Sequence, residues 1–131
     1  MTLRLDTFAV DCTDPGALAQ FWTQALGWER AFEDASEVVI AAPDQNGDAA
    51  NLAFYRVPEV KPGGTKNRLH LDLRPDDQAD EVARLQALGA RTVDIGQSGA
   101  ESWVVMADPE GNEFCVLRAV APGVDRYEGG V

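Results

Sequence analysis

The feature that most constrains how this chain can fold is an internal repeat. The segment ALGW at 25–28 and the similar segment ALGA at 87–90 each close a longer stretch, 14–27 and 76–89, with helical features. Each stretch begins with an aspartate that can cap a helix and ends near a glycine that can stop it. Apolar residues recur in both at the spacing of one helix face. The sequence therefore predicts two equivalent helices in two equivalent halves.

Strand-like segments surround both predicted helices in the same order. One precedes each helix, at 3–12 and 67–74, and three short ones follow. The following segments lie at about 28–33, 37–42 and 51–57 in the first half, and at about 91–95, 102–107 and 112–118 in the second. Both halves, 3–57 and 67–119, therefore have the order βαβββ. The Pro- and Gly-rich segment 58–66 is expected to link them, and the tail, 120–131, to be flexible.

One half alone would leave a face of its sheet uncovered. We therefore expect a single domain, 1–119, of the α+β class, in which the halves pair side by side. Their strands would form a curved eight-stranded mixed sheet with both helices on the outer face. The inner face would be concave, and concave faces are where small ligands bind.

Composition narrows the classes of partner. The formal net charge is −11, which argues against binding to nucleic acid or to an anionic membrane surface, since both need Lys and Arg. No apolar run approaches the roughly 20 residues of a membrane span, and no signal-peptide pattern is visible. The two cysteines, Cys12 and Cys115, do not make a disulfide framework. We expect a reduced, cytoplasmic protein.

Three quoted segments carry a family resemblance. With the paired βαβββ halves, DPGALAQFWTQALGW, NRLHLDLRPDDQADEVARLQALGA and ADPEGNEFCVLR resemble the vicinal oxygen chelate superfamily. This superfamily contains glyoxalases, bleomycin-resistance proteins and extradiol dioxygenases. The sequence of the three segments is most similar to that of small actinobacterial glyoxalase-like proteins. The resemblance covers about residues 3–119 and implies the curved eight-stranded fold.

The resemblance also implies four places for metal ligands, on the first and last strands of each half. Carried over to this sequence, they are Thr7, His70, Cys115 and either Leu52 or Phe54. Glyoxalase-type sites use His and carboxylate oxygens around an octahedral ion, and catalytic zinc needs about three protein ligands. Only His70 and Cys115 are candidate ligands, so we expect no metal and no cofactor.

Alternation of side chains predicts which residues face the concave side. They are Thr7, Ala9 and Asp11 on the first strand, His70, Asp72 and Arg74 on 67–74, and Glu113, Cys115 and Leu117 on the last strand. The alternate residues are expected to pack under the helices: Phe8, Val10, Cys12, Leu69, Leu71, Leu73, Phe114 and Val116. Candidate aromatic walls are Trp28, Phe54, Tyr55 and Trp103. The predicted ligand-binding residues are Thr7, Phe54, His70, Asp72, Arg74, Trp103 and Cys115.

The sequence leaves more than one interpretation open for His70 and Cys115. His70 is a polar group of the pocket, a specific ligand-binding or acid–base residue, or a metal ligand. A contact with Asp72, two residues on, would raise its pKa and suit acid–base work near pH 7. Cys115 is a small apolar filler, or a reactive thiol if His70 or Arg74 brings a positive charge close. Lys66 and Arg68 form a small basic spot, expected to be a solvated strand end.

Three functions remain open. The first is a glyoxalase or bleomycin-resistance-like protein that binds a small organic molecule, such as an antibiotic or a secondary metabolite. The resemblance implies a homodimer with clefts between subunits. The second is a lyase, isomerase or dioxygenase in which His70, with Asp72 or Glu113, moves a proton or holds a metal. The third is an interaction module whose aromatic residues simply fill a closed cavity.

Overall fold

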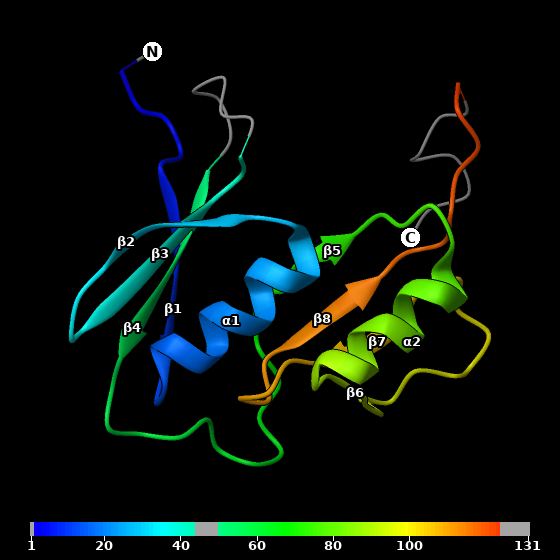
Figure 1. The fold of residues 1–131 in the computed structure, drawn as a ribbon. Coiled ribbons are helices and arrows are strands. Elements are labelled where there is room, and N and C mark those ends of the chain that lie inside the picture. The colour runs from blue at the N-terminus through cyan, green and yellow to red at the C-terminus, as the bar shows by residue number, and fades with distance from the viewer. Residues whose placement is uncertain (1, 44–49, 124–131) are drawn as a thin grey trace. The chain divides into compact units, whose positions relative to one another are not determined.

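The computed structural model describes residues 2–43 and 50–123 of the 131-residue chain. The chain divides into two compact units, Met1–Pro62 and Gly63–Val131, and the boundary falls inside the predicted linker 58–66. Each unit has the predicted order βαβββ, and the α+β class is confirmed (Figure 1). The pairing of the halves into one eight-stranded sheet and one domain stays a prediction. The predicted flexible tail lies outside the described residues from 124 onward.

The first unit is a four-stranded sheet with one helix against it. Its elements are β1 (Thr7–Cys12), α1 (Pro15–Leu26), β2 (Glu29–Glu33), β3 (Glu37–Ala41) and β4 (Asn51–Arg56). The strand order is β1-β4-β3-β2, in which β1 is parallel to β4 and the other pairs are antiparallel. Helix α1 contacts β3 and β4, and Leu18, Ile40 and Phe54 are fully buried in this unit.

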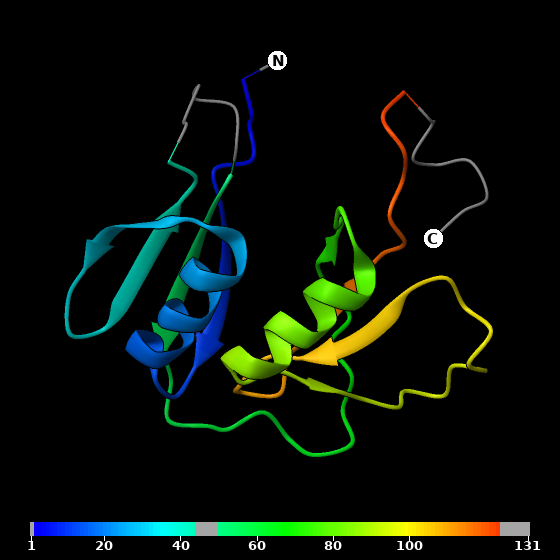
Figure 2. The ribbon, with the colours of Figure 1, turned by 45° about the vertical axis from the view of Figure 1, so that its right-hand side comes forward.

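The second unit repeats this topology with shorter strands. Its elements are β5 (Asp72–Leu73), α2 (Gln78–Leu88), β6 (Arg91–Thr92), β7 (Val104–Ala107) and β8 (Glu113–Val116). The order is β5-β8-β7-β6, again with the first strand parallel to the last. Helix α2 lies in front of these strands in the view of Figure 2. Met106, Phe114 and Val116 are buried in its core, and Leu85 of α2 is buried too.

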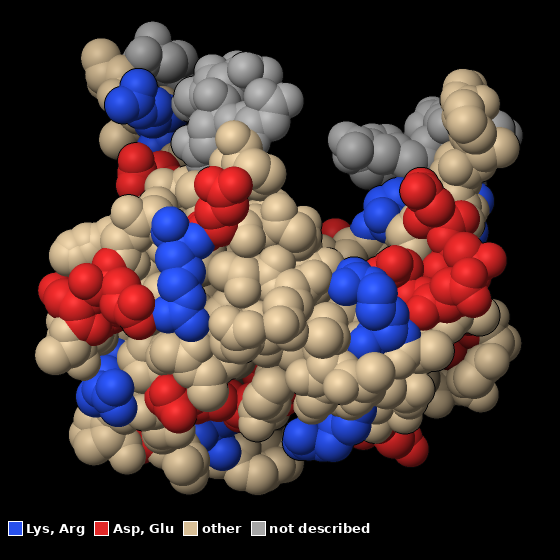
Figure 3. Space-filling view, in the orientation of Figure 1, with Lys and Arg blue, Asp and Glu red and all other residues tan. Residues whose placement is uncertain are grey.

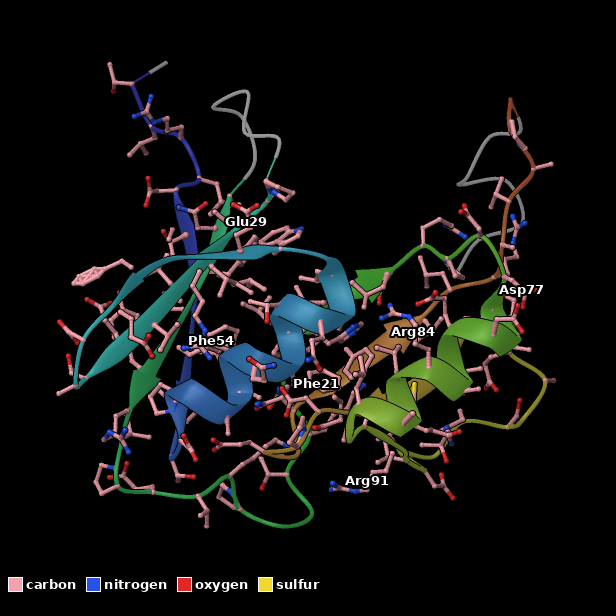
Figure 4. All side chains as sticks on the ribbon, viewed as in Figure 1. Phe21, Glu29, Phe54, Asp77, Arg84 and Arg91 are labelled. Carbon is pink, nitrogen blue, oxygen red and sulfur yellow. The ribbon has the colours of Figure 1, made fainter. Side chains whose placement is uncertain are left out.

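The two helices begin at aspartate caps. Asp14 accepts a hydrogen bond from the backbone N–H of Ala17 at 3.1 Å, as predicted. In the second unit Asp77, and not Asp76, accepts from the N–H of Asp80 at 2.9 Å, and it stands at the start of α2 in Figure 4. The prediction that Asp76 caps the helix is therefore wrong. The capping side chain must reach the N–H three residues on, and α2 starts one residue later than the repeat suggested.

Two residues predicted to pack under the helices are exposed. The side chain of Leu69 is 84% exposed and that of Phe8 is 41% exposed. Strand β5 begins only at Asp72, so Leu69 precedes the sheet, and β1 is an edge strand of its own sheet. Cys12, Phe114 and Val116 are buried as predicted. No helix among the described residues is both long and apolar enough to cross a bilayer.

Candidate functional site

The second unit contains a pocket of about 380 Å³. Its residues come from β5 and the segment leading into it, from β8 and the residue that follows it, and from the loop before β7. They are Lys66, His70, Asp72, Ile95, Gly96, Gln97, Glu101, Trp103, Cys115 and Leu117. This volume is within the range of small-molecule sites, which combine apolar walls with a few polar groups.

The apolar part of the pocket rests on the core of the second unit. Cys115 and Leu117 are each 7% exposed and form a buried cluster with Val105. Trp103 is half-buried and packs against this cluster. The indole is thus held by the core and still lines the pocket, so it can act as a wall for an apolar or aromatic ligand.

The loop between β6 and β7 is shaped by its own side chains. Glu101 accepts hydrogen bonds from the backbone N–H and hydroxyl of Ser98 and from the N–H of Gly99. The backbone hydrogen bond from Ser98 is the main cause that lowers the pKa of Glu101. Gln97 donates from Nε2 to the carbonyl of Val93 at 2.9 Å. These bonds hold the loop in shape, and Gln97 and Glu101 both line the pocket.

The polar end of the pocket is built by the pairing of β5 with β8. Asp72 and Cys115 are register partners on these parallel strands, and the N–H of Cys115 donates to the carbonyl of Leu71 at 2.9 Å. His70 precedes Asp72 by two residues, and its Nδ1 lies 3.2 Å from Asp72 Oδ1. A carboxylate can only accept, so this contact assigns the proton of a neutral ring to Nδ1 and leaves Nε2 as an acceptor.

The thiol of Cys115 is held in its protonated form. Burial is the largest cause that raises its pKa to about 11, and the negative charge of Asp72 and a hydrogen bond to it add to the effect. Lys66 acts in the opposite direction and is outweighed. A reactive cysteine needs a positive environment that favours the thiolate. Cys115 is therefore no nucleophile at neutral pH.

The same three side chains form a set of metal-ligating groups. One ligand atom from each of His70, Asp72 and Cys115 lies within 4.8 Å of the other two. A thiol does not suit a hard ion such as Mn²⁺ or Mg²⁺, which prefers oxygen ligands. A nitrogen, an oxygen and a sulfur do suit zinc, which takes three protein ligands and leaves a fourth position open in catalytic sites.

Four of the predicted ligand-binding residues meet in this pocket: His70, Asp72, Trp103 and Cys115. The other three lie elsewhere. Thr7 and Phe54 belong to the first unit, where the Thr7 hydroxyl donates to Asp6 and Phe54 is completely buried. Arg74 donates from Nη1 to the carbonyl of Arg118 at 2.7 Å and is not among the lining residues.

Sequence reasoning did not assign Lys66, Ile95, Gly96, Gln97 and Glu101 to the pocket. The signal that could have found most of them is the segment DIGQSGAESW at 94–103, which has two glycines and ends on a tryptophan. Gly96 and Gly99 adopt positive φ angles of 96° and 89°, so the segment turns there and does not extend the predicted strand 91–95.

Comparisons with known proteins agree with this architecture. Residues 7–117 match the family model described as a glyoxalase-like domain. No curated protein matches the chain. Solved structures of similar fold include a glyoxalase/bleomycin resistance protein/dioxygenase family enzyme from Burkholderia phytofirmans PsJN. That structure is 16% identical with a TM-score of 0.65, and the alignment covers 87% of this chain and 97% of that one.

Two further solved structures carry ligands. A bleomycin-binding protein complexed with bleomycin is 20% identical with a TM-score of 0.57, over 89% of this chain and 98% of that one. A fosfomycin resistance protein from Listeria monocytogenes, complexed with Mn(II) and a dihydroxypropylphosphonic acid, is 10% identical with a TM-score of 0.65. This match covers 92% of each chain. At such identities the likeness concerns the fold alone.

Proposed function

Because this chain belongs to the glyoxalase-like domain family of the vicinal oxygen chelate superfamily, we propose that it binds a small organic molecule in the pocket of its second unit. The observation that carries the proposal is the pocket itself. An aromatic wall and an apolar floor lead to a polar end with two side chains, His70 and Asp72, already paired with each other.

The lining residues predict a ligand with an apolar part and a polar part. An apolar or aromatic part would pack against Trp103 and Ile95, whose surfaces are only partly covered, and near the buried Leu117, which also lines the pocket. A polar part would lie near His70, Asp72 and Lys66, where it finds an acceptor nitrogen, a carboxylate and an ammonium group. Secondary metabolites with fused or linked rings and a few polar substituents combine an apolar part and a polar part in this way.

This binding needs no resident metal. The side chains already supply both apolar and polar contacts, and Thr7 and Phe54 cannot complete the four-position ligand set that the family resemblance implies. A bleomycin-binding structure of the same fold supports an antibiotic or a related metabolite as the ligand. We further propose a cytoplasmic homodimer, for which the family resemblance is the support.

The test is a thermal-shift screen of the untagged full chain with bleomycin and a panel of aromatic secondary metabolites. A ligand that binds only the folded state stabilises it by about 2.7 kcal/mol at a hundredfold excess over its Kd. We expect at least one compound to raise the melting temperature in a saturable way. A panel without any saturable shift would favour the closed interaction module.

The contact between His70 and Asp72 favours one second candidate, an enzyme. The 3.2 Å pair leaves Nε2 of His70 free to accept a proton from a bound substrate, while Asp72 would stabilise the imidazolium. The variant His70→Ala separates the two functions. A binder would keep most of its affinity, whereas a lyase or isomerase would bind its substrate and lose turnover by about 10²–10⁴-fold.

A further inference from the structure

The polar end of the pocket supports an inference that goes beyond binding of an organic ligand. We propose that His70, Asp72 and Cys115 form a three-donor site for a thiophilic divalent cation of the Zn²⁺ class. All three donors belong to the second unit; His70 and Cys115 stand at two of the four positions that the family resemblance implies, whereas Asp72 stands at none of them. The site therefore differs from the octahedral site of oxygen and imidazole ligands in that resemblance, and it revises the expectation of no metal.

The backbone fixes the three donors close to the required separation. Tetrahedral zinc bonds of 2.0–2.3 Å put neighbouring ligand atoms about 3.3–3.8 Å apart. His70 Nδ1 and Asp72 Oδ1 are already 3.2 Å apart, and no pair within the cluster exceeds 4.8 Å. A side-chain movement of about 1 Å would close the set. Because β5 and β8 are hydrogen-bonded neighbours, no rearrangement of the sheet is needed.

The local charge favours a cation. The carboxylate of Asp72 faces both His70 and Cys115, and the only cationic side chain lining the pocket, among the described residues, is Lys66. In the metal-free protein the imidazole and the thiol share one carboxylate. A divalent ion would give each of the three groups its own bond to a positive centre, which is the arrangement that a metal site provides.

The uptake step balances without any redox partner. The Sγ–H bond of Cys115 breaks, its proton leaves to the solvent, and the sulfur electron pair forms the bond to the cation. A neutral His70 binds through Nδ1 after its ring proton moves from Nδ1 to Nε2, and the carboxylate of Asp72 binds directly, so neither group releases a further proton. One proton is thus released for each ion bound, as is usual for thiolate sites. The fourth position would hold water or a heteroatom of a ligand in the pocket.

Cobalt titration of the untagged full chain tests this site, because Co²⁺ replaces Zn²⁺ and reports its ligands by absorption. A thiolate ligand gives a near-ultraviolet sulfur-to-cobalt charge-transfer band, and tetrahedral coordination gives intense visible bands. We expect both to saturate at one Co²⁺ per chain and to disappear when Zn²⁺ is added. The wild-type result needs no variant, so it stands even if a variant fails to fold.

Variants then assign the ligands. Cys115→Ser should lose the charge-transfer band, while Cys12→Ala, the matched control at the other buried cysteine, should keep it. His70→Ala and Asp72→Asn should each weaken Zn²⁺ binding by at least about 10–100-fold. Mutating a residue that only hydrogen-bonds to a metal ligand typically lowers metal affinity by that factor, and a direct ligand should matter at least as much. Circular dichroism checks that each variant is folded.

Three results would overturn the proposal. One is the absence of a charge-transfer band in folded wild-type protein under excess Co²⁺. Another is a band that survives Cys115→Ser and disappears in Cys12→Ala. The third is unchanged Zn²⁺ affinity in both His70→Ala and Asp72→Asn. None of these results bears on the thermal-shift screen, which is run in the presence of a chelator, so the metal site and the organic ligand are tested separately.

Discussion

At the scale of single residues, the pocket depends on which side chains share a face. Alternation along 67–74 and 112–118 predicted that His70, Asp72 and Cys115 point the same way, and the structure brings these three together. Alternation also assigned Arg74 to that face, but its guanidinium turns to the carbonyl of Arg118. Alternation along a strand predicts the side of the sheet to which a Cβ atom points. The position of the charged group at the end of a long side chain depends instead on the hydrogen bonds that it makes.

The reactivity of Cys115 is a prediction at this scale. With its pKa raised from 9.0 to about 11, the thiolate fraction below pH 9 is about 100-fold smaller than for an ordinary cysteine. We expect alkylation by iodoacetamide to be correspondingly slow at pH 8 and to accelerate as the pH approaches 11. Mass spectrometry of the Cys115 peptide measures the rate. Asp72→Asn removes the charge that opposes the thiolate and should speed the reaction. Fast labelling of the wild type at pH 7 would contradict the assignment.

At the scale of elements, the repeat located both helices and the first residue of α1, but not the first residue of α2. The sequence PDDQ at 75–78 offers two adjacent aspartates as caps, and only the geometry of the helix start decides between them. The loop 94–103 was harder to predict, since hydrogen bonds from Gln97 and Glu101 and two positive φ angles define it. Such local bonds have no periodicity that a sequence pattern could display.

The two adjacent aspartates make a matched pair for testing the helix cap. Asp77→Ala removes the acceptor for the N–H of Asp80, and we expect it to lower the free energy of unfolding by about 1 kcal/mol. Asp76→Ala, one residue away, should change it by less than about 0.5 kcal/mol. Urea denaturation followed by circular dichroism measures both. Equal losses in the two variants would show that the cap is wrongly assigned.

The turn before β8 carries a second prediction about elements. Asp108 is 1% exposed, and its Oδ1 accepts from the N–H groups of Glu110 and Asn112 at 3.0 Å. Asp108→Ala would leave these donors without their charged acceptor, so we expect a loss of about 2–3 kcal/mol in stability. Because β8 supplies Cys115 and Leu117, the variant should also bind any pocket ligand less tightly. Unchanged unfolding in urea would refute this role.

At the scale of the whole molecule, the internal repeat was the most informative feature. It predicted the βαβββ order of both halves, each of which has a four-stranded mixed sheet in the structure, and the family model spans both. The pocket was less predictable, because half of its lining comes from a loop and not from the strands. The formal net charge is −11, and Figure 3 shows patches of Asp and Glu side chains interspersed with patches of Lys and Arg on one face. An excess of negative charge does not attract polyanions such as nucleic acids.

The central claim is that an organic ligand binds in the pocket of the second unit, against Trp103. Its most direct test is a calorimetric titration, with the first compound from the thermal-shift screen, of three proteins: the wild type, Trp103→Ala and Tyr55→Ala. Tyr55 is a partly exposed aromatic residue of the first unit and serves as the matched control. We predict that Trp103→Ala weakens binding by about tenfold or more, which corresponds to about 1.4 kcal/mol, and that Tyr55→Ala leaves it unchanged. Equal affinity of the wild type and a folded Trp103→Ala variant would contradict the account.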